Sequence, residues 1–189
     1  MSSHHIVREK QEPALIVDSI SGFDTELLGQ LLEWSPTIIA NKESAHDLSR
    51  QDIHIDLLIS DEENGVQQEE TTAVYADRAA FKETALNYLI EKEYQAATIV
   101  THDRSLHLLQ RFASLINIVL INGGQKLFTI KSGFKKWKAA NEKVYIFDDE
   151  THFQVKGLKR EEHLCYATLD NGFFEIHFDK DFLVIGEDL

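Results

Sequence analysis

Short apolar runs alternate with amphipathic segments along the first two thirds of the chain. The run ALIVD at 14–18 predicts a strand, and the leucines that follow recur on one face of a helix that Asp24 can cap. The same alternation predicts, in order, strand 37–40, helix 43–51, strand 53–60, a long helix that Asp77 can cap, strand 96–101, helix 103–112 and strand 116–121. Strands that alternate with helices indicate a parallel sheet with helices on both faces.

The pattern changes after Gly123-Gly124, where short β-rich runs follow one another with turn residues between them. These runs are KLFTI, KVYIF, HFQV, EHLCYATL, FFEIHF and FLVI. Asn171-Gly172 separates two of the runs, and this dipeptide is typical of a β-hairpin. We therefore predict an α/β protein in which a Rossmann-like parallel-sheet domain at 1–122 precedes an antiparallel β-sandwich domain at 123–189.

The charge balance limits the classes of partner that the protein can bind. The chain has 32 acidic and 19 basic residues, a net charge of −13, which repels nucleic acid and anionic membranes, so we expect neither as a partner. The single cysteine, Cys165, has no internal disulfide partner and is expected to be a small buried residue of a strand. The N-terminus lacks the apolar core of a signal peptide, and we expect a cytoplasmic location.

An acidic cluster directly follows the predicted strand 53–60. The stretch IHIDLLISDEENG places Asp61, Glu62 and Glu63 at the end of this strand, before an Asn-Gly turn. Carboxylates at a strand end can hold a magnesium ion for phosphate chemistry. Acidic residues beside Asn-Gly are also typical of a solvated turn, so both interpretations stay open on the residues alone.

Several segments resemble bacterial thiamine pyrophosphokinases. They are EPALIV (12–17), ELLGQLLEWSP (26–36), IDLLISDEE (55–63), KETALNYLIEKEY (82–94), the helix near Arg104 and His107, KSGFKKW (131–137) and GLK (157–159). The order of an α/β domain followed by a β domain is also similar. The resemblance implies transfer of a pyrophosphoryl group from ATP to thiamine, which gives thiamine diphosphate and AMP. It further implies Mg²⁺ held by carboxylates of the α/β domain, and thiamine bound at a homodimer interface.

The sequence departs from the family pattern at the elements that handle metal and phosphate. Where the family has Gly-Asp-Phe-Asp, this chain has Ser60-Asp61-Glu62-Glu63, so the resemblance implies Asp61 and Glu63 as the remaining metal ligands. The family's Asp-Gly-Ala falls on Lys42-Glu43-Ser44, and a lysine there reverses the charge but can contact a phosphate directly. The family's Lys-Thr-Asp falls on Ala79-Ala80-Phe81, whose side chains cannot bind Mg²⁺.

The family's Arg-x-Asp-His element is retained only in part. Arg104 and His107 match it, whereas Leu106 stands at the aspartate position. The Ser-Asn element that contacts thiamine in the family is missing after GLK. At the start of a helix Arg104 can bind an anion, or it can be an ordinary surface or interface arginine that pairs with an acid.

Two hypotheses follow from this comparison. The first is a non-catalytic or altered thiamine pyrophosphokinase-like protein that forms a homodimer and holds no cofactor. The second is an active ATP:thiamine diphosphotransferase whose site is rebuilt from Asp61, Glu63, Arg104 and His107. In it Asp61 and Glu63 hold Mg²⁺ with ATP, Arg104 and Lys42 contact phosphate, and His107 orients the substrate. A third possibility, a different small molecule bound between the two domains, also stays open.

Overall fold

The computed structural model describes residues 12–34, 36–61, 71–148 and 152–189. Glu63, one of the two expected metal ligands, therefore lies outside the described residues. Residue contacts divide the chain into two compact units, with the division between His102 and Asp103. Each unit is described by itself below. None of the described helices is long and apolar enough to cross a membrane.

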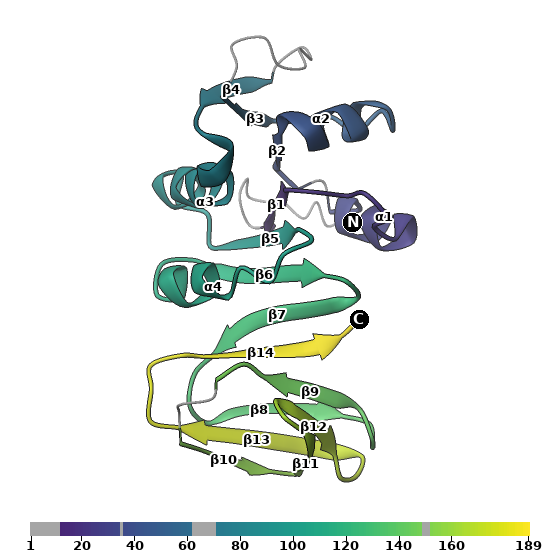
Figure 1. Ribbon diagram of the computed structural model, residues 1–189, viewed down its shortest axis with the longest axis vertical. Coiled ribbons are helices and arrows are strands. Elements are labelled where there is room, and N and C mark those ends of the chain that lie inside the picture. The colour runs from purple at the N-terminus through teal and green to yellow at the C-terminus, as the bar shows by residue number, and fades with distance from the viewer. Residues whose placement is uncertain (1–11, 35, 62–70, 149–151) are drawn as a thin grey trace, which may run out of the picture. The chain divides into compact units, whose positions relative to one another are not determined.

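The first unit is built on a parallel sheet whose strands follow the order β5-β1-β2-β3-β4 (Figure 1). The bounds are β1 Ala14–Val17, β2 Ile38–Asn41, β3 Leu57–Ser60, β4 Thr72–Tyr75 and β5 Ala96–Val100. Ile16 at the centre of the sheet pairs with Ile39 on one side and Ile99 on the other. Every residue of β1, β2 and β3 is buried, because helices cover both faces, and these strands therefore consist almost entirely of apolar residues.

Helices pack on both faces of this sheet, as the alternating pattern predicted (Figure 1). Their bounds are α1 Thr25–Leu32, α2 Lys42–Ser49, the short 3₁₀ helix η1 Arg78–Ala80 and α3 Phe81–Glu91. On one face, Leu28 of α1 and Leu48 of α2 share a core cluster with Leu15 and Val17. On the other face lies α3, which contacts β1 and β3. Asp24 caps α1 as predicted, because its carboxylate accepts hydrogen bonds from the first-turn amides.

The second unit consists of one helix and two antiparallel sheets (Figure 1). Strands of the larger sheet follow the order β11-β12-β9-β14-β7-β6, and those of the smaller sheet the order β10-β13-β8. The bounds are α4 Leu106–Phe112, β6 Asn117–Asn122, β7 Gln125–Ile130, β8 Phe134–Lys138, β9 Lys143–Ile146, β10 Phe153–Lys156, β11 Leu158–Glu162, β12 Cys165–Thr168, β13 Gly172–Phe178 and β14 Leu183–Asp188. Because α4 packs on β6, β7 and β14, the units divide earlier in the chain than the predicted boundary near residue 122.

The two sheets of the second unit enclose an apolar core that contains one charged group. Ile146 and Ile185 of the larger sheet meet Phe174 and Ile176 of the smaller one. Among these apolar side chains lies Glu187 of β14, which is 1% exposed. A buried carboxylate is costly unless nearby cations compensate it.

Three lysines surround the Glu187 carboxylate. Its Oε2 accepts a hydrogen bond from Lys136 Nζ at 2.6 Å and lies 3.4 Å from Lys126 Nζ, while Lys138 Nζ is 3.9 Å from Oε1. Lys126 is the cross-strand neighbour of Glu187 on β7. Lys136 and Lys138 belong to β8 of the smaller sheet. The ionic contacts therefore join the two sheets.

The prediction of a β-hairpin at Asn171-Gly172 is wrong. The strand before it, β12, pairs with β11 and β9, whereas the strand after it, β13, pairs with β10 and β8. The Asn-Gly turn thus carries the chain from one sheet to the other. This crossing allows Phe174 and Ile176 to complete the core from the opposite side.

Cys165 is buried in β12, as the sequence predicted. Its side chain is 8% exposed, and burial raises the pKa of the thiol above its usual value. Because the thiolate is the reactive form, this cysteine is expected to behave as a small apolar side chain.

Candidate functional site

Polar side chains gather where the parallel strands of the first unit end. Asp18 follows β1, Asn41 ends β2, Ser60 and Asp61 end β3, and Thr101 follows β5. The carboxyl ends of parallel strands lie at one edge of a sheet, so these residues come together although they are far apart in sequence. Ligands of open α/β sheets bind at this edge. It is therefore the candidate functional site of the first unit.

Asp18 is the centre of a hydrogen-bond network at this edge. Its Oδ2 accepts from Lys82 Nζ at 3.0 Å and from Thr101 Oγ1 at 2.7 Å, and its Oδ1 lies 3.3 Å from Asn41 Nδ2. The side chains of Lys82 and Asp18 are 15% and 24% exposed, and Thr101 is buried. The network links the ends of β1, β2 and β5 to α3. The partly buried ion pair between Lys82 and Asp18 restricts the positions of these side chains.

Asn41 positions the start of α2 at the same edge. Its Nδ2 donates to the carbonyl of Asp18 at 2.8 Å, and its Oδ1 accepts from the amide of Ser44 at 2.9 Å, which is a helix N-cap contact. Ser44 Oγ donates to the same Asp18 carbonyl at 2.8 Å. The first turn of α2 is thus fixed to the end of β1, and Lys42, the first residue of the helix, is held at the sheet edge.

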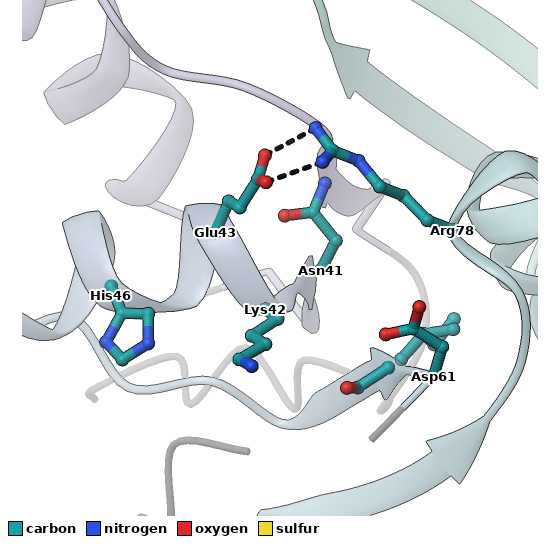
Figure 2. A pocket seen from close by; sticks show the side chains of 8 residues that line it. Asn41, Lys42, Glu43, His46, Asp61 and Arg78 are labelled. Atoms are coloured by element: carbon teal, nitrogen blue, oxygen red, sulfur yellow. Dashed lines mark hydrogen bonds and ion pairs between the residues drawn. The ribbon is translucent and has the colours of Figure 1, made fainter.

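A pocket of about 260 Å³ opens beside this helix start (Figure 2). It is lined by Asn41, Lys42, Glu43, His46, Ile59, Ser60, Asp61 and Arg78. Cationic and anionic side chains both line it: Lys42 comes from the start of α2, and Asp61 from the end of β3. Asp61 is exposed, whereas Ser60 beside it is buried. The pocket can therefore offer a positive charge, a carboxylate and helix amides to one small ligand.

Arg78 and Glu43 form a bidentate ion pair at the pocket wall (Figure 2). The distances are 2.6 Å from Nη1 to Oε1 and 2.5 Å from Nη2 to Oε2. The two side chains are 68% and 63% exposed. Ion pairs this exposed contribute little to stability, about 0–1 kcal/mol, so a ligand can displace either partner at small cost.

Of the residues that the sequence singled out, the pocket contains Lys42 and Asp61. Arg104 and His107 belong to the second unit. Arg104 Nη2 donates to Gln125 Oε1 at 3.3 Å, and the guanidinium lies 5.7 Å from the centre of the Phe147 ring. His107 is an exposed residue of α4. The roles expected for Arg104, His107 and Glu63 stay predictions.

Sequence reasoning missed Asp18, Asn41, Lys82 and Thr101. A usable signal was present, because Asp18, Asn41 and Thr101 are the first polar residues at the ends of three buried apolar runs. In a parallel sheet, such residues lie together at one edge. Lys82 carried a weaker signal, since it follows the buried Phe81 on α3 and no pattern in the sequence relates it to β1.

Comparison with known proteins gives structural but no sequence matches. No protein-family model matches the chain, and no curated protein sequence matches it. The thiamine pyrophosphokinase of Bacillus subtilis aligns with a TM-score of 0.67 at 16% identity, over 93% of this chain and 98% of that one. Yeast thiamin pyrophosphokinase aligns with a TM-score of 0.68 at 9% identity, over 97% and 88%.

A third solved structure, the thiamin pyrophosphokinase from Candida albicans, aligns with a TM-score of 0.63 at 9% identity, over 94% of this chain and 89% of that one. Nearly the whole length of each chain is superimposed, so the similarity includes both the parallel sheet and the antiparallel sheets. At identities this low the likeness concerns the fold and not the residues of a site. This chain has the fold of the thiamine pyrophosphokinases.

Proposed function

We propose that this thiamine pyrophosphokinase-fold protein is non-catalytic or altered in activity, and that its first unit binds a phosphate-bearing small molecule such as ATP. One observation carries the proposal: Lys42 lines the pocket at the start of α2, and the exposed guanidinium of Arg78 lines the same pocket. The resemblance aligns Lys42 with a family aspartate. A cation there favours direct contact with phosphate over contact through a metal ion.

The described residues of the pocket do not fit a magnesium ion. Mg²⁺ prefers several oxygen ligands in octahedral geometry, and a neighbouring ammonium group opposes its binding. Of the two carboxylates in the pocket, Glu43 is engaged by Arg78, which leaves Asp61 beside Lys42. Among the described residues, no group of three or more His, Cys, Asp or Glu side chains is arranged to hold a metal.

Phosphate binding in this pocket needs only modest rearrangement. Lys42 and Glu43, the first two residues of α2, line the pocket, so the positive end of the helix lies beside it, and Lys42 adds an ammonium group. Arg78 can exchange the Glu43 carboxylate for phosphate oxygens, because both are bidentate partners for a guanidinium and the existing pair is exposed. We infer that Lys42 supplies most of the affinity and that Arg78 joins once the ligand is bound.

Removal of the Lys42 charge is expected to weaken ATP binding about tenfold, the loss of one charge-assisted contact. Titration calorimetry with ATP, with and without Mg²⁺, measures this for the wild type and Lys42→Gln. Arg50→Gln is the matched control, since it removes one charge from the other end of α2, where the arginine side chain is 81% exposed. Equal affinities for Lys42→Gln and wild type would contradict the proposed role of Lys42.

The alternative, an active thiamine pyrophosphokinase, is separated from this proposal by a turnover assay. The assay follows conversion of thiamine and ATP to thiamine diphosphate and AMP in the presence of Mg²⁺. We expect no conversion above that of a buffer blank. Conversion that disappears in Asp61→Ala would instead establish the active enzyme, with Asp61 and Glu63 as metal ligands and Arg104 and His107 at the substrates.

We also propose that the protein is a cytoplasmic homodimer, in line with the resemblance and with the exposed aromatic side chains of the smaller sheet. Trp137 and Phe173 are cross-strand neighbours on β8 and β13, and they are 55% and 60% exposed. Apolar patches of this kind favour association between chains. Size-exclusion chromatography with light scattering is expected to give about twice the mass of the chain, and a monomer at micromolar concentration would refute the proposal.

A further inference from the structure

A second pocket lies within the second unit, and the proposed nucleotide site does not involve it. Its volume is about 300 Å³. Apolar walls come from Ile146 of β9, Phe153 of β10 and Leu164, and polar groups come from Arg160, His163, Tyr166 and Asp148. Because β9, β11 and β12 belong to the larger sheet and β10 to the smaller one, the pocket opens between the two sheets.

Tyr166, a buried residue of β12, lines this pocket. The residue is 7% exposed, and its ring packs edge-on against Phe153, with centroids 5.9 Å apart. Within the described part of the chain the hydroxyl makes no hydrogen bond, and the one buried side-chain oxygen there that lacks both a partner and solvent contact is Glu187 Oε1. The Tyr166 hydroxyl therefore remains accessible to solvent, and Tyr166 lines the pocket. A hydroxyl group that contacts solvent and makes no hydrogen bond to the described residues is available to a ligand.

Arg160 lies directly opposite Tyr166 in the β11–β12 pair. Cross-strand partners project on the same face of a sheet, so the guanidinium and the hydroxyl serve one pocket. The register shifts between Arg160 and Glu162, which marks a β-bulge of the kind that redirects side chains beside functional sites. The Arg160 Nε lies 3.4 Å from the Glu162 carbonyl, and in the described residues the guanidinium forms no ion pair. Its terminal N–H groups can therefore bind a ligand.

The carboxylate in the pocket wall, that of Asp148, is paired with a lysine. Asp148 accepts a hydrogen bond from Lys180 Nζ at 2.8 Å, and its side chain is 9% exposed. Arg160 thus brings to the pocket a permanent positive charge that forms no ion pair among the described residues, beside the Tyr166 hydroxyl and the imidazole of His163. One negative charge on the ligand would balance that of Arg160, whereas a second would face the Asp148 carboxylate.

Leu164, which also lines the pocket, has a strained backbone conformation. Leu164 has a φ of 65°, in the left-handed region that side chains other than Gly and Asn rarely occupy. Its carbonyl accepts from the amide of Ile146 at 2.9 Å, which fixes the turn against β9. Glycine would adopt this backbone conformation without strain, but the residue here is leucine, and its side chain forms part of the apolar pocket lining.

We propose that this pocket binds a small organic monocarboxylate with an apolar body, held by Arg160 and Tyr166. The carboxylate accepts two parallel hydrogen bonds from the guanidinium and one from the tyrosine hydroxyl. The apolar body packs against Ile146, Phe153 and Leu164. The pocket volume suits an aromatic or branched aliphatic acid better than a nucleotide.

Benzoate is the probe that tests this site, with benzyl alcohol as the uncharged analogue and phenyl phosphate as the dianionic one. Amide chemical shifts of the labelled full-length protein are followed by NMR during titration. We expect saturable benzoate binding with shifts at residues 158–168, at least about tenfold weaker in Arg160→Gln and about three- to tenfold weaker in Tyr166→Phe. Lys159→Gln is the matched control, because this exposed neighbour projects from the other face of β11.

Several outcomes would overturn the proposal. They are an absence of saturable benzoate binding to the wild type, equal affinity in Arg160→Gln, and benzyl alcohol binding as tightly as benzoate. Tighter binding of phenyl phosphate would overturn the ligand class. The wild-type fold is retained in Arg160→Gln if amide shifts distant from the pocket are unchanged, so a loss of binding reports on the site. Tyr166→Phe keeps the buried ring and removes the hydroxyl alone.

Discussion

Replacement of Glu187 by alanine is expected to lower the free energy of unfolding by about 3–5 kcal/mol, because it leaves the partly buried ammonium groups of Lys136 and Lys126 without their counter-charge, while Lys138 keeps its ion pair with Glu142. Glu187 is 1% exposed, and the Lys138 and Lys136 side chains are 11% and 36% exposed. Both lysines approach from the opposite sheet, so the loss acts on the contact between the sheets and not on one strand alone. Truncation also leaves a cavity in the sandwich.

Urea unfolding measures this loss through the fluorescence of Trp137, in a Trp34→Phe background that removes the signal of the first unit. Glu175→Ala is the control, since Glu175 pairs with Lys135 at 2.9 Å on the outer face of the smaller sheet, where a much smaller effect is expected. A double variant with methionine at 136 and 187 should recover part of the stability, because an apolar pair replaces the ionic one. Equal losses for Glu187→Ala and Glu175→Ala would contradict the role given to Glu187.

Replacement of Asp18 by alanine is expected to lower the free energy of unfolding by about 2–4 kcal/mol. The change removes an acceptor that the Lys82 ammonium and the buried Thr101 hydroxyl share. It also removes one contact of Asn41, whose amide holds the start of α2. We therefore expect weaker ATP binding in addition to the loss of stability, since Lys42 depends on this helix start.

Asp61→Ala separates this prediction from a general effect of strand-end carboxylates. Asp61 also follows a buried strand of the same sheet, but it is exposed, and a change of less than about 0.5 kcal/mol is expected. Urea unfolding followed by Trp34 fluorescence, in a Trp137→Phe background, gives both values. If Asp61→Ala costs as much as Asp18→Ala, the Asp18 network is not the main polar contact of this edge.

The first unit could be predicted well because its central strands are buried on both faces. The apolar runs at β1, β2, β3 and β5 give a signal that needs no knowledge of their neighbours. The edge strand β4 was missed, since none of its four residues, TAVY, is buried and the run follows a long polar stretch. A strand at the centre of a sheet can be recognised from its run of apolar residues, whereas an exposed edge strand has no such run.

The second unit was harder to predict because charged residues face its interior. On β8 the inward positions are Phe134, Lys136 and Lys138, so the alternation of apolar and polar residues is lost. The lysines can face inward because carboxylates lie opposite them: Glu187, far away in sequence, pairs with Lys136, and Lys138 lies near both Glu187 and Glu142. Strand β11 was missed for a related reason, since four of its five residues are exposed. Long-range charge pairing of this kind has no local signature.

The candidate site was predicted only in part for the same physical reason. Asp61 was found from its place after a predicted strand and Lys42 through resemblance, and both line the pocket. The Asp18 network was not found, because the contact between Asp18 and Lys82 depends on how α3 packs against β1. Tyr166 and Arg160 were not predicted as site residues either, since their pairing depends on the register of β11 and β12.

The inward lysines of β8 have a consequence for the solubility of the folded chain. β8 is an edge strand of the three-stranded sheet, and unpaired edges can recruit a strand from another molecule and begin aggregation. An incoming strand that extended the sheet would have to place its own side chains beside Lys136 and Lys138, and apolar side chains there would remove water from these charged groups. The ionic cluster that holds the sandwich together therefore also makes its open edge a poor template for fibre growth.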